Sequence, residues 1–311
     1  PVPFINITKK DLEKTNLAQD IPTLLKNLPS VVTTSDSGSG IGYSSIMIRG
    51  SDQTRVNVTI NGVPYNDSES YMSYWVDLPD FASSIESIQV QRGVGTSTNG
   101  PAAFGGSINI LTNAASEKPS FEINNTLGSF NTVKNSIGFS TGFINDKFEF
   151  SGRLSRIKSD GYIDRSGSKL RSYFLQGIFK NENSLLKILT FAGHEVTDQA
   201  WFGIDSSTLE TNRKYNPAGE YYDKMGNTLY YDDQDDNYKQ DHYQFHWNQS
   251  YENGWISNLG LHYTYGRGYW ENYNVGYDDG ISVPVDYIDR RWLDNDFYGI
   301  LFSLNQKNDL Y

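Results

Sequence analysis

The chain has 311 residues, a formal net charge of -11, no cysteine, 28 glycines and 14% aromatic residues, a profile that excludes a disulfide scaffold and does not suit a disordered chain. The acidic balance argues against a nucleic-acid partner, because phosphate binding needs clustered Lys and Arg. The absence of cysteine excludes a thiolate metal site and a catalytic thiol.

Residues 1 to about 113 are predicted to form a compact α+β domain. Thr8 and Asp11 stand at capping-box spacing before a short helix, and a second helix begins at Asp20 with Pro22 and stops at Pro29. A flexible segment rich in serine and glycine is predicted at 35–40. Short strands, each bounded by Gly, Pro or Asn, are predicted at 45–49, 55–60, 85–91 and 106–112.

From about residue 119 the pattern changes to long amphipathic strands. Apolar and polar residues alternate at period two in 148–155, 242–251, 255–265 and 297–305. About eight strands are expected up to the last residue. Short turns near Asn145, Glu182, Asn253 and Asn308 alternate with longer connections near 159–168, 198–238 and 268–292. Short turns on one side and long loops on the other are typical of an outer-membrane β-barrel whose long loops face outside.

No run of about 18 apolar residues is present, which excludes a transmembrane helix. A membrane-spanning barrel is compatible with this finding, because its lipid-facing residues occupy alternating positions. No signal-peptide pattern begins at Pro1.

Four motifs follow one another in the first part of the chain. They are Ile48-Arg49-Gly50, the segment 60–64, the segment 85–93, and a glycine-rich segment that ends at 102–112. Their order and spacing closely resemble the plug domain of TonB-dependent outer-membrane receptors. The combination is specific, because chance matches to short patterns do not occur in one fixed order within about a hundred residues.

The resemblance implies a plug domain at 1–113 and, at 114–311, antiparallel transmembrane strands that form the first part of a barrel. A barrel that holds a plug needs about 22 strands, so about eight strands form a partial barrel. The alternative is an eight-stranded barrel with an appended soluble domain. We disfavour it, because such a lumen holds only its own side chains.

The resemblance also implies a function, namely a receptor in the outer membrane of a Gram-negative bacterium that imports a scarce nutrient into the periplasm. A ferric siderophore or similar iron chelate is the favoured ligand, followed by cobalamin and then by a glycan, a peptide or haem. A surface adhesin or docking protein without transport is the competing class. A secreted enzyme is disfavoured, because Walker A, His-Glu-x-x-His and Gly-x-Ser-x-Gly motifs are missing, and no cofactor is expected.

In this family a segment upstream of the plug adds as a strand to the inner-membrane energy transducer TonB, and that segment should precede Pro1. Further expected partners are the ligand, outer-membrane lipid and a surface lipoprotein. The residues that match the family's charged plug positions are Arg49, Glu86 and Arg92, which would pair with barrel carboxylates outside this stretch of chain. Two roles stay open for them, because paired charges can orient the plug or gate it.

By the same resemblance, the loops 35–43 and 65–75 are apical and would touch the ligand. Aromatic residues beside polar groups suit a ligand with flat apolar parts. The alternative is that Tyr74 and Trp75 pack against the barrel wall. The candidates for ligand contact are Tyr43, Tyr65, Tyr71, Tyr74 and Trp75.

The histidines and one acidic cluster are the candidates for metal binding. His242 and His246 would stand about 13 Å apart on a strand, so they cannot chelate one ion, and they and His262 are predicted to face the lumen. The acidic cluster lies in the longest predicted loop and fails the spacing of an EF-hand. A looser calcium site and a solvated run of charges are the two interpretations of Asp232, Asp233, Asp235 and Asp236.

Overall fold

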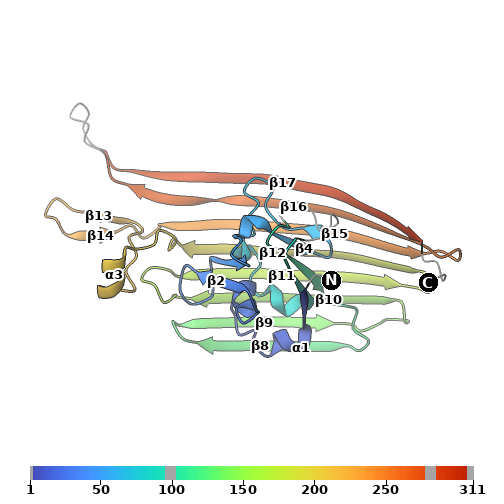
Figure 1. The fold of residues 1–311 in the computed structure, drawn as a ribbon. Helices are drawn as coiled ribbons and strands as arrows, with labels where there is room; N and C mark the ends of the chain where they lie inside the picture. The colour runs from blue at the N-terminus through green and yellow to red at the C-terminus, as the bar shows by residue number, and fades with distance from the viewer. Residues whose placement is uncertain (1–2, 95–102, 277–284, 307–311) are drawn as a thin grey trace.

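The computed structural model describes residues 3–94, 103–276 and 285–306. They form an N-terminal domain, whose last strand ends at Thr112, and one large antiparallel sheet that begins at Ser120. The domain lies against one face of that sheet (Figure 1). Among the described helices, none has the length and apolar character needed to cross a membrane.

The N-terminal domain is built on a five-stranded sheet with the order β1-β6-β7-β4-β5, in which only β4 and β7 run parallel. Its strands are β1 (Phe4–Thr8), β4 (Val56–Ile60), β5 (Val63–Pro64), β6 (Ile85–Arg92) and β7 (Gly106–Thr112). A separate hairpin joins β2 (Val31–Ser35) and β3 (Ser44–Ile48). The helical elements are α1 (Lys9–Glu13), α2 (Ile21–Leu25) and the 3-10 turns η1 (Gln53–Arg55), η2 (Trp75–Asp77) and η3 (Phe81–Ser84).

Local sequence explains most of these boundaries. The predicted capping box is present before α1, where the Thr8 hydroxyl donates to Asp11 Oδ2 at 2.7 Å. Asn61 and Gly62 both have positive φ, 54° and 81°, which is the geometry of the two-residue turn that joins β4 to β5. The α2 helix ends at Leu25, earlier than predicted. Strands β1 and β2 were not predicted, because each is short and is recognised only by its pairing partner.

The large sheet has eight strands, which confirms the predicted number. Its order is β17-β16-β15-β12-β11-β10-β9-β8, so each strand pairs with its neighbours along the chain once the small hairpin is set aside. The strands are β8 (Ser120–Gly128), β9 (Thr132–Ser140), β10 (Phe148–Ser159), β11 (Ser168–Lys180), β12 (Ser184–Asp198), β15 (Asp235–Ser250), β16 (Trp255–Asn274) and β17 (Tyr287–Gln306).

From β10 onward the connections between these strands alternate in length, as predicted, whereas the connection between β8 and β9 spans only 129–131. The longest one, between β12 and β15, contains α3 (Ser206–Thr211) and the hairpin of β13 (Glu220–Tyr222) and β14 (Thr228–Tyr230). The connection predicted at 268–292 is shorter, because β16 and β17 extend through a rung in which Tyr269 and Trp292 pack with ring centroids 4.8 Å apart. The turn predicted near Asn308 lies outside the described residues.

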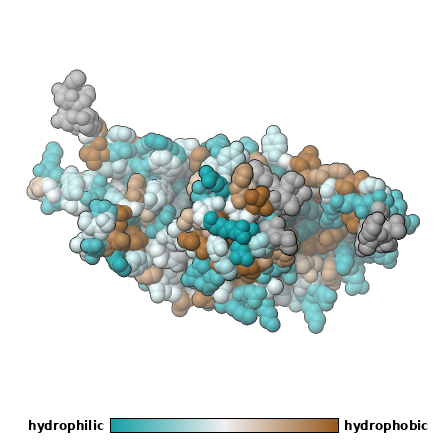
Figure 2. All heavy atoms as spheres, in the orientation of Figure 1, coloured by the Kyte–Doolittle hydropathy of each residue, from teal (hydrophilic) through white to brown (hydrophobic). Residues whose placement is uncertain are grey.

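The two faces of the large sheet differ in what covers them. The inner face packs on the N-terminal domain, and one core cluster contains Phe174 and Phe191 of the sheet together with Trp75 and Phe81 of the domain. The outer face presents apolar side chains such as Leu154, which is 62% exposed. Figure 2 views the molecule from the domain's side, where hydrophilic and hydrophobic residues are interspersed.

Candidate functional site

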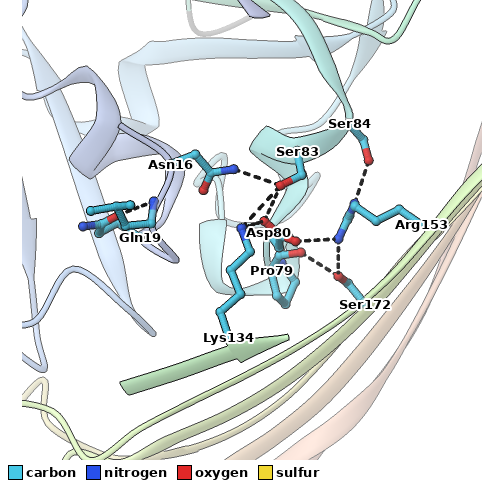
Figure 3. Close-up of polar contacts among 10 residues, drawn as sticks. Asn16, Gln19, Pro79, Asp80, Ser83, Ser84, Lys134, Arg153 and Ser172 are labelled. Atoms are coloured by element: carbon cyan, nitrogen blue, oxygen red, sulfur yellow. Dashed lines mark hydrogen bonds and ion pairs between the residues drawn. The ribbon is translucent and has the colours of Figure 1, made fainter. Parts of the chain in front are cut away.

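The most polar part of the contact between domain and sheet is centred on Asp80, which lies at the N-cap of η3 (Figure 3). Its Oδ2 accepts a hydrogen bond from Arg153 Nη1 at 3.0 Å, and its Oδ1 accepts one from Lys134 Nζ. The two cations come from adjacent strands, β10 and β9. All three side chains are buried, so this ion cluster is shielded from water. We call these three residues the Asp80 cluster.

Three serines add hydrogen bonds around the Asp80 cluster, although Arg153 Nη2 has no partner in the described part of the chain. Ser83 donates to Asp80 Oδ1 at 2.6 Å, and Ser84 accepts from Arg153 Nε at 2.8 Å. Ser172 of β11 accepts from Arg153 Nη1 at 3.2 Å and donates to the carbonyl oxygen of Pro79 at 2.7 Å. Burial alone would raise the pKa of Asp80, but Arg153 and Lys134 together hold that pKa below its usual range.

A second polar contact brings carboxylates together near the long connections. The hydroxyl of Tyr43 donates to Asp236 Oδ2 at 2.5 Å and stands 3.2 Å from Glu195 Oε1. Asp77 of η2 is buried beside them, and its Oδ1 has no hydrogen-bond partner in the described part of the chain. We call Asp77, Glu195 and Asp236 the carboxylate cluster.

Burial dominates the electrostatics of the carboxylate cluster on the domain side. It raises the pKa of Tyr43, and the nearby charges of Glu195 and Asp236 raise that pKa further. Burial likewise raises the pKa of Asp77, with Asp236 as the next contribution. The Asp80 cluster therefore attracts the domain to the sheet through opposite charges, whereas Asp77 in the carboxylate cluster favours its protonated form.

Further contacts hold the domain at the other end of the strands. Lys187 Nζ of β12 donates to Thr112 Oγ1 at 2.7 Å and to the carbonyl oxygen of Asn113 at 3.1 Å. Asn61 Nδ2 donates to Gln244 Oε1 of β15 at 3.1 Å. These bonds anchor the ends of β7 and β4 to the sheet.

The backbones of β12 and η2 also lie in direct contact, with no side chain between them. Gly193 of β12 lies so close to η2 that a β-carbon on it would overlap the carbonyl oxygen of Asp77 and stand 2.7 Å from Cδ of Pro79. A cavity of about 780 Å³ opens beside the Asp80 cluster, between the domain and β8 to β10. Its lining includes Lys134 and Arg153 and is mostly polar.

The five predicted ligand contacts fall into different environments. Tyr71 is 52% exposed, whereas Trp75 is 1% exposed and belongs to the core, so the prediction of ligand contact is wrong for Trp75. The hydroxyl of Tyr65 donates to the carbonyl oxygen of Tyr74 at 2.5 Å, and both rings pack inward. Tyr43 packs edge-on against Trp201, with ring centroids 5.3 Å apart. Of the five, Tyr71 is the side chain most open to a ligand.

The three predicted plug charges make other contacts. Arg49 is exposed, Glu86 accepts the backbone N–H of Ala114 at 3.3 Å, and Arg92 donates to the carbonyl oxygen of Pro29 at 3.5 Å. Within the described ranges, none of Arg49, Glu86 and Arg92 forms an ion pair. Their pairing with other carboxylates stays a prediction. Sequence reasoning missed the Asp80 cluster, although Lys134 and Arg153 are charges at inward positions of amphipathic strands.

The four carboxylates of the acidic segment 232–236 lie in different environments, and the looser calcium site stays a prediction. Asp236 is buried against Tyr43, whereas Asp232 and Asp233 are exposed, so the four carboxylates do not converge. No group of three or more His, Asp or Glu side chains in the described ranges is placed to hold a metal ion. His242 and His262 face inward and are buried, as predicted, and His246 is partly buried.

Comparison with known proteins identifies the N-terminal domain. Residues 1–107 match the family model described as the TonB-dependent Receptor Plug Domain. Among curated proteins, the chain is similar to the vitamin B12 transporter BtuB of Vibrio cholerae, with 27% identity over 224 residues. That match covers 72% of this chain and 34% of BtuB, so the chain spans about a third of the length of this relative.

Solved structures extend the similarity to the whole fold. The copper transporter OprC superposes with a TM-score of 0.72 at 15% identity, over 98% of this chain and 44% of OprC. The ferric preacinetobactin receptor BauA from Acinetobacter baumannii also gives a TM-score of 0.72, at 16% identity, over 99% of this chain and 44% of BauA. The large sheet therefore has the fold of barrel strands in such receptors.

Proposed function

The chain belongs to the TonB-dependent receptors, with a plug domain followed by strands of the barrel, and on this premise we propose that it serves nutrient import across the outer membrane. The observation that carries the proposal is the Asp80 cluster, which ties plug to barrel through charges shielded from water. Removing one partner of such a cluster is costly, so the plug stays seated until work is done on it. A receptor that opens only when energised needs this property.

The ligand class best supported is a ferric siderophore or a similar iron chelate. The long connections carry basic side chains over aromatic rings, with the Arg165 guanidinium 3.5 Å from the ring centre of Tyr230 and Lys214 Nζ 5.5 Å from that of Tyr162. Together with the exposed Tyr71, they suit a ligand that is flat in part and carries negative charge. Binding of a ferric chelate by BauA supports the same class.

Cobalamin is the second candidate ligand. Its support is the match to a vitamin B12 transporter, which extends over 72% of this chain and so includes barrel strands as well as the plug. Loops grafted on a shared fold decide the ligand, so this match alone does not select cobalamin.

The proposed setting is the outer membrane of a Gram-negative bacterium, with the long connections outside. The proposed partners are the energy transducer TonB, which would act through a segment upstream of the plug, and a surface lipoprotein. Strand addition by such a segment relies on backbone hydrogen bonds and tolerates many sequences.

Uptake by whole cells tests the proposal. The gene that encodes this chain is deleted from its host, and uptake of radioactive iron from a panel of ferric chelates and of labelled cobalamin is measured. The same measurements are made after complementation and in a strain without the energy transducer. We expect one ferric chelate to lose uptake in both deletion strains and to regain it on complementation.

Other outcomes contradict parts of the proposal. Selective loss of cobalamin uptake replaces the iron chelate by the second candidate. Unchanged uptake of all these compounds overturns both ligands and directs the search to glycans, peptides or surface docking. Uptake that needs the gene but not the energy transducer overturns energised import.

A further inference from the structure

The outward face of the large sheet carries an apolar band. Side chains alternate between the two faces, and on this face the exposed apolar residues include Phe150 and Leu154 of β10, Leu175 of β11, Ile188 of β12 and Tyr243 of β15. An apolar groove of about 630 Å³ runs through the band and is lined by Phe150, Leu175, Ile188 and Tyr243. The backbone of Gly177 also lines the groove.

A row of basic residues crosses five strands directly beyond this band. In the strand register Arg156 pairs with Arg171, Arg171 with His194, His194 with Lys239, and Lys239 with Arg267. Arg156 shares the outward face with Leu154 and stands about 7 Å further along β10. The next outward rung on the first two strands pairs Lys158 with Lys169.

Like charges in directly opposed positions repel and destabilise a sheet. At one end of the row this repulsion is relieved by Asp241, which lies 2.7 Å from Lys239, whereas Arg267 has only a distant carboxylate, Asp294 at 3.9 Å. The β10-β11 end is different. Arg156, Arg171 and Lys169 are exposed and form no ion pair within the described ranges, and Lys158 reaches Asp160 only at 4.0 Å.

The position of these charges along the strands indicates which part of the membrane they face. The β10 and β11 ends that carry them are joined by the connection at 160–167, on the side of the sheet with the long connections. The side with long connections faces outside in an outer-membrane barrel. The four basic residues thus lie at the height where an apolar band gives way to the headgroups of the outer leaflet, in a chain whose net charge is -11.

We propose that Arg156, Lys158, Lys169 and Arg171 form a binding site for the phosphate-bearing headgroup of a membrane lipid. A lipid held there places an acyl chain along the apolar groove beside Leu175 and Ile188. Arginine and lysine bind phosphate through charge-assisted hydrogen bonds, which removes the repulsion between the opposed cations. The inference rests on the proposed function, since it requires the strands to span the outer membrane.

Lipid retention by the purified full-length receptor tests the site. The receptor in neutral detergent is titrated with a doubly phosphorylated glycolipid, with its dephosphorylated form and with inorganic phosphate, and bound lipid is counted by native mass spectrometry. The test variant carries Arg156→Gln, Lys158→Gln, Lys169→Gln and Arg171→Gln. The control carries Lys147→Gln and Lys180→Gln, two exposed lysines by the opposite ends of β10 and β11, and the variant with only Arg156→Gln and Arg171→Gln matches its loss of two charges.

We expect the wild type and the control to bind the phosphorylated lipid equally and the test variant to bind it more weakly by on the order of a thousandfold. Equal binding by the test variant, equal binding of the dephosphorylated form, or displacement by inorganic phosphate at matched concentration would each overturn the proposal. Retention of the folded form in a heat-modifiability gel shows that the variant's barrel is intact.

Separate readouts distinguish this inference from the proposed function. Membrane fractionation reports whether the protein reaches the outer membrane, and absence from that fraction overturns both. Nutrient uptake with no phosphate-dependent lipid binding overturns only the lipid site. Lipid binding in a receptor that imports neither iron chelate nor cobalamin supports the lipid site and overturns only the proposed classes of imported ligand.

Discussion

A β-carbon on Gly193 of β12 would overlap the carbonyl oxygen of Asp77 in the plug, because the two backbones meet there with no side chain between them. The plug segment from Asp77 to Asp80 is therefore seated on the barrel wall by shape as well as by charge. Any side chain at Gly193 has to push this segment away from the wall, since neither neighbour is the end of a flexible side chain.

Gly193→Ala should lower the stability of the seated plug. We expect a loss of about 1–3 kcal/mol, as for other overpacked positions. The control is Gly177→Ala in β11, where a β-carbon would meet nothing closer than Phe150 at 3.4 Å. Protease accessibility of the plug and the midpoint of thermal unfolding measure the effect. Equal behaviour of the two variants would show that the close approach at Gly193 does not hold the plug.

Asp80→Asn should destabilise the junction strongly, because it leaves Arg153 and Lys134 buried without an anion. Breaking a buried pair in this way costs about 3–5 kcal/mol. The control is Asp164→Asn, which removes an exposed pair with Lys214 at 3.9 Å and should shift the midpoint much less, because exposed ion pairs contribute little. The midpoint of thermal unfolding reports both changes.

The double variant Asp80→Asn with Lys134→Met separates charge from packing. It should recover part of the loss, because one of the two unpaired cations is gone. Additive losses in the double variant would contradict the ion cluster.

Low pH should also destabilise the junction, because it protonates Asp80 and so removes the same negative charge. The pKa of this carboxyl is lowered in the folded state, so its stabilisation is present above pH about 4 and is lost as the pH falls through the folded pKa. The midpoint of thermal unfolding reports this loss as well.

Asp77→Asn should change how stability depends on pH. The pKa of Asp77 is raised in the folded state, so above pH about 4 the folded protein holds a proton that the unfolded chain has released. The stability of the wild type therefore falls as the pH rises from there through the folded pKa. Asparagine is neutral throughout, so the variant should gain stability relative to the wild type as the pH rises above about 4.

Thermal unfolding at a series of pH values checks the Asp77 prediction. The exposed Asp232→Asn provides the baseline for removing one negative charge from the protein. A difference between Asp77→Asn and the wild type that stays constant over this pH range would contradict a retained proton at Asp77.

Tyr71→Ala and Trp75→Ala should separate ligand binding from packing. Tyr71 is 52% exposed, so its loss should change stability by no more than about 0.5 kcal/mol while weakening binding of the nutrient identified by uptake. Trp75 is 1% exposed in the core, so its loss should cost about 3–5 kcal/mol. Unfolding midpoints and equilibrium binding to whole cells measure the two effects. Unchanged ligand affinity in Tyr71→Ala would remove Tyr71 from the proposed binding surface.

Local patterns predicted those parts of the fold that depend on neighbouring residues. Strand β7 begins and ends where its pattern predicted, and β6 differs by one residue at its end, because alternation and flanking turn residues are short-range signals. β1 escaped prediction because its five residues form a strand only in the register of β6. The full length of β16 and β17 was not predicted for the same reason, since their ends are held by contacts across the strands, such as that of Tyr269 with Trp292.

The sequence by itself determined the family, the change from a mixed domain to long strands, and the expected number of strands. It did so because motif order, turn residues and period-two alternation are local properties of the chain. The tertiary structure alone decided which charges meet. Asp80 lies 54 residues from Lys134 and 73 from Arg153, and the three converge only once the plug is seated on the strands. The burial of Trp75 and the row from Arg156 to Arg267 were decided in the same way, because burial and strand register arise from packing between distant segments.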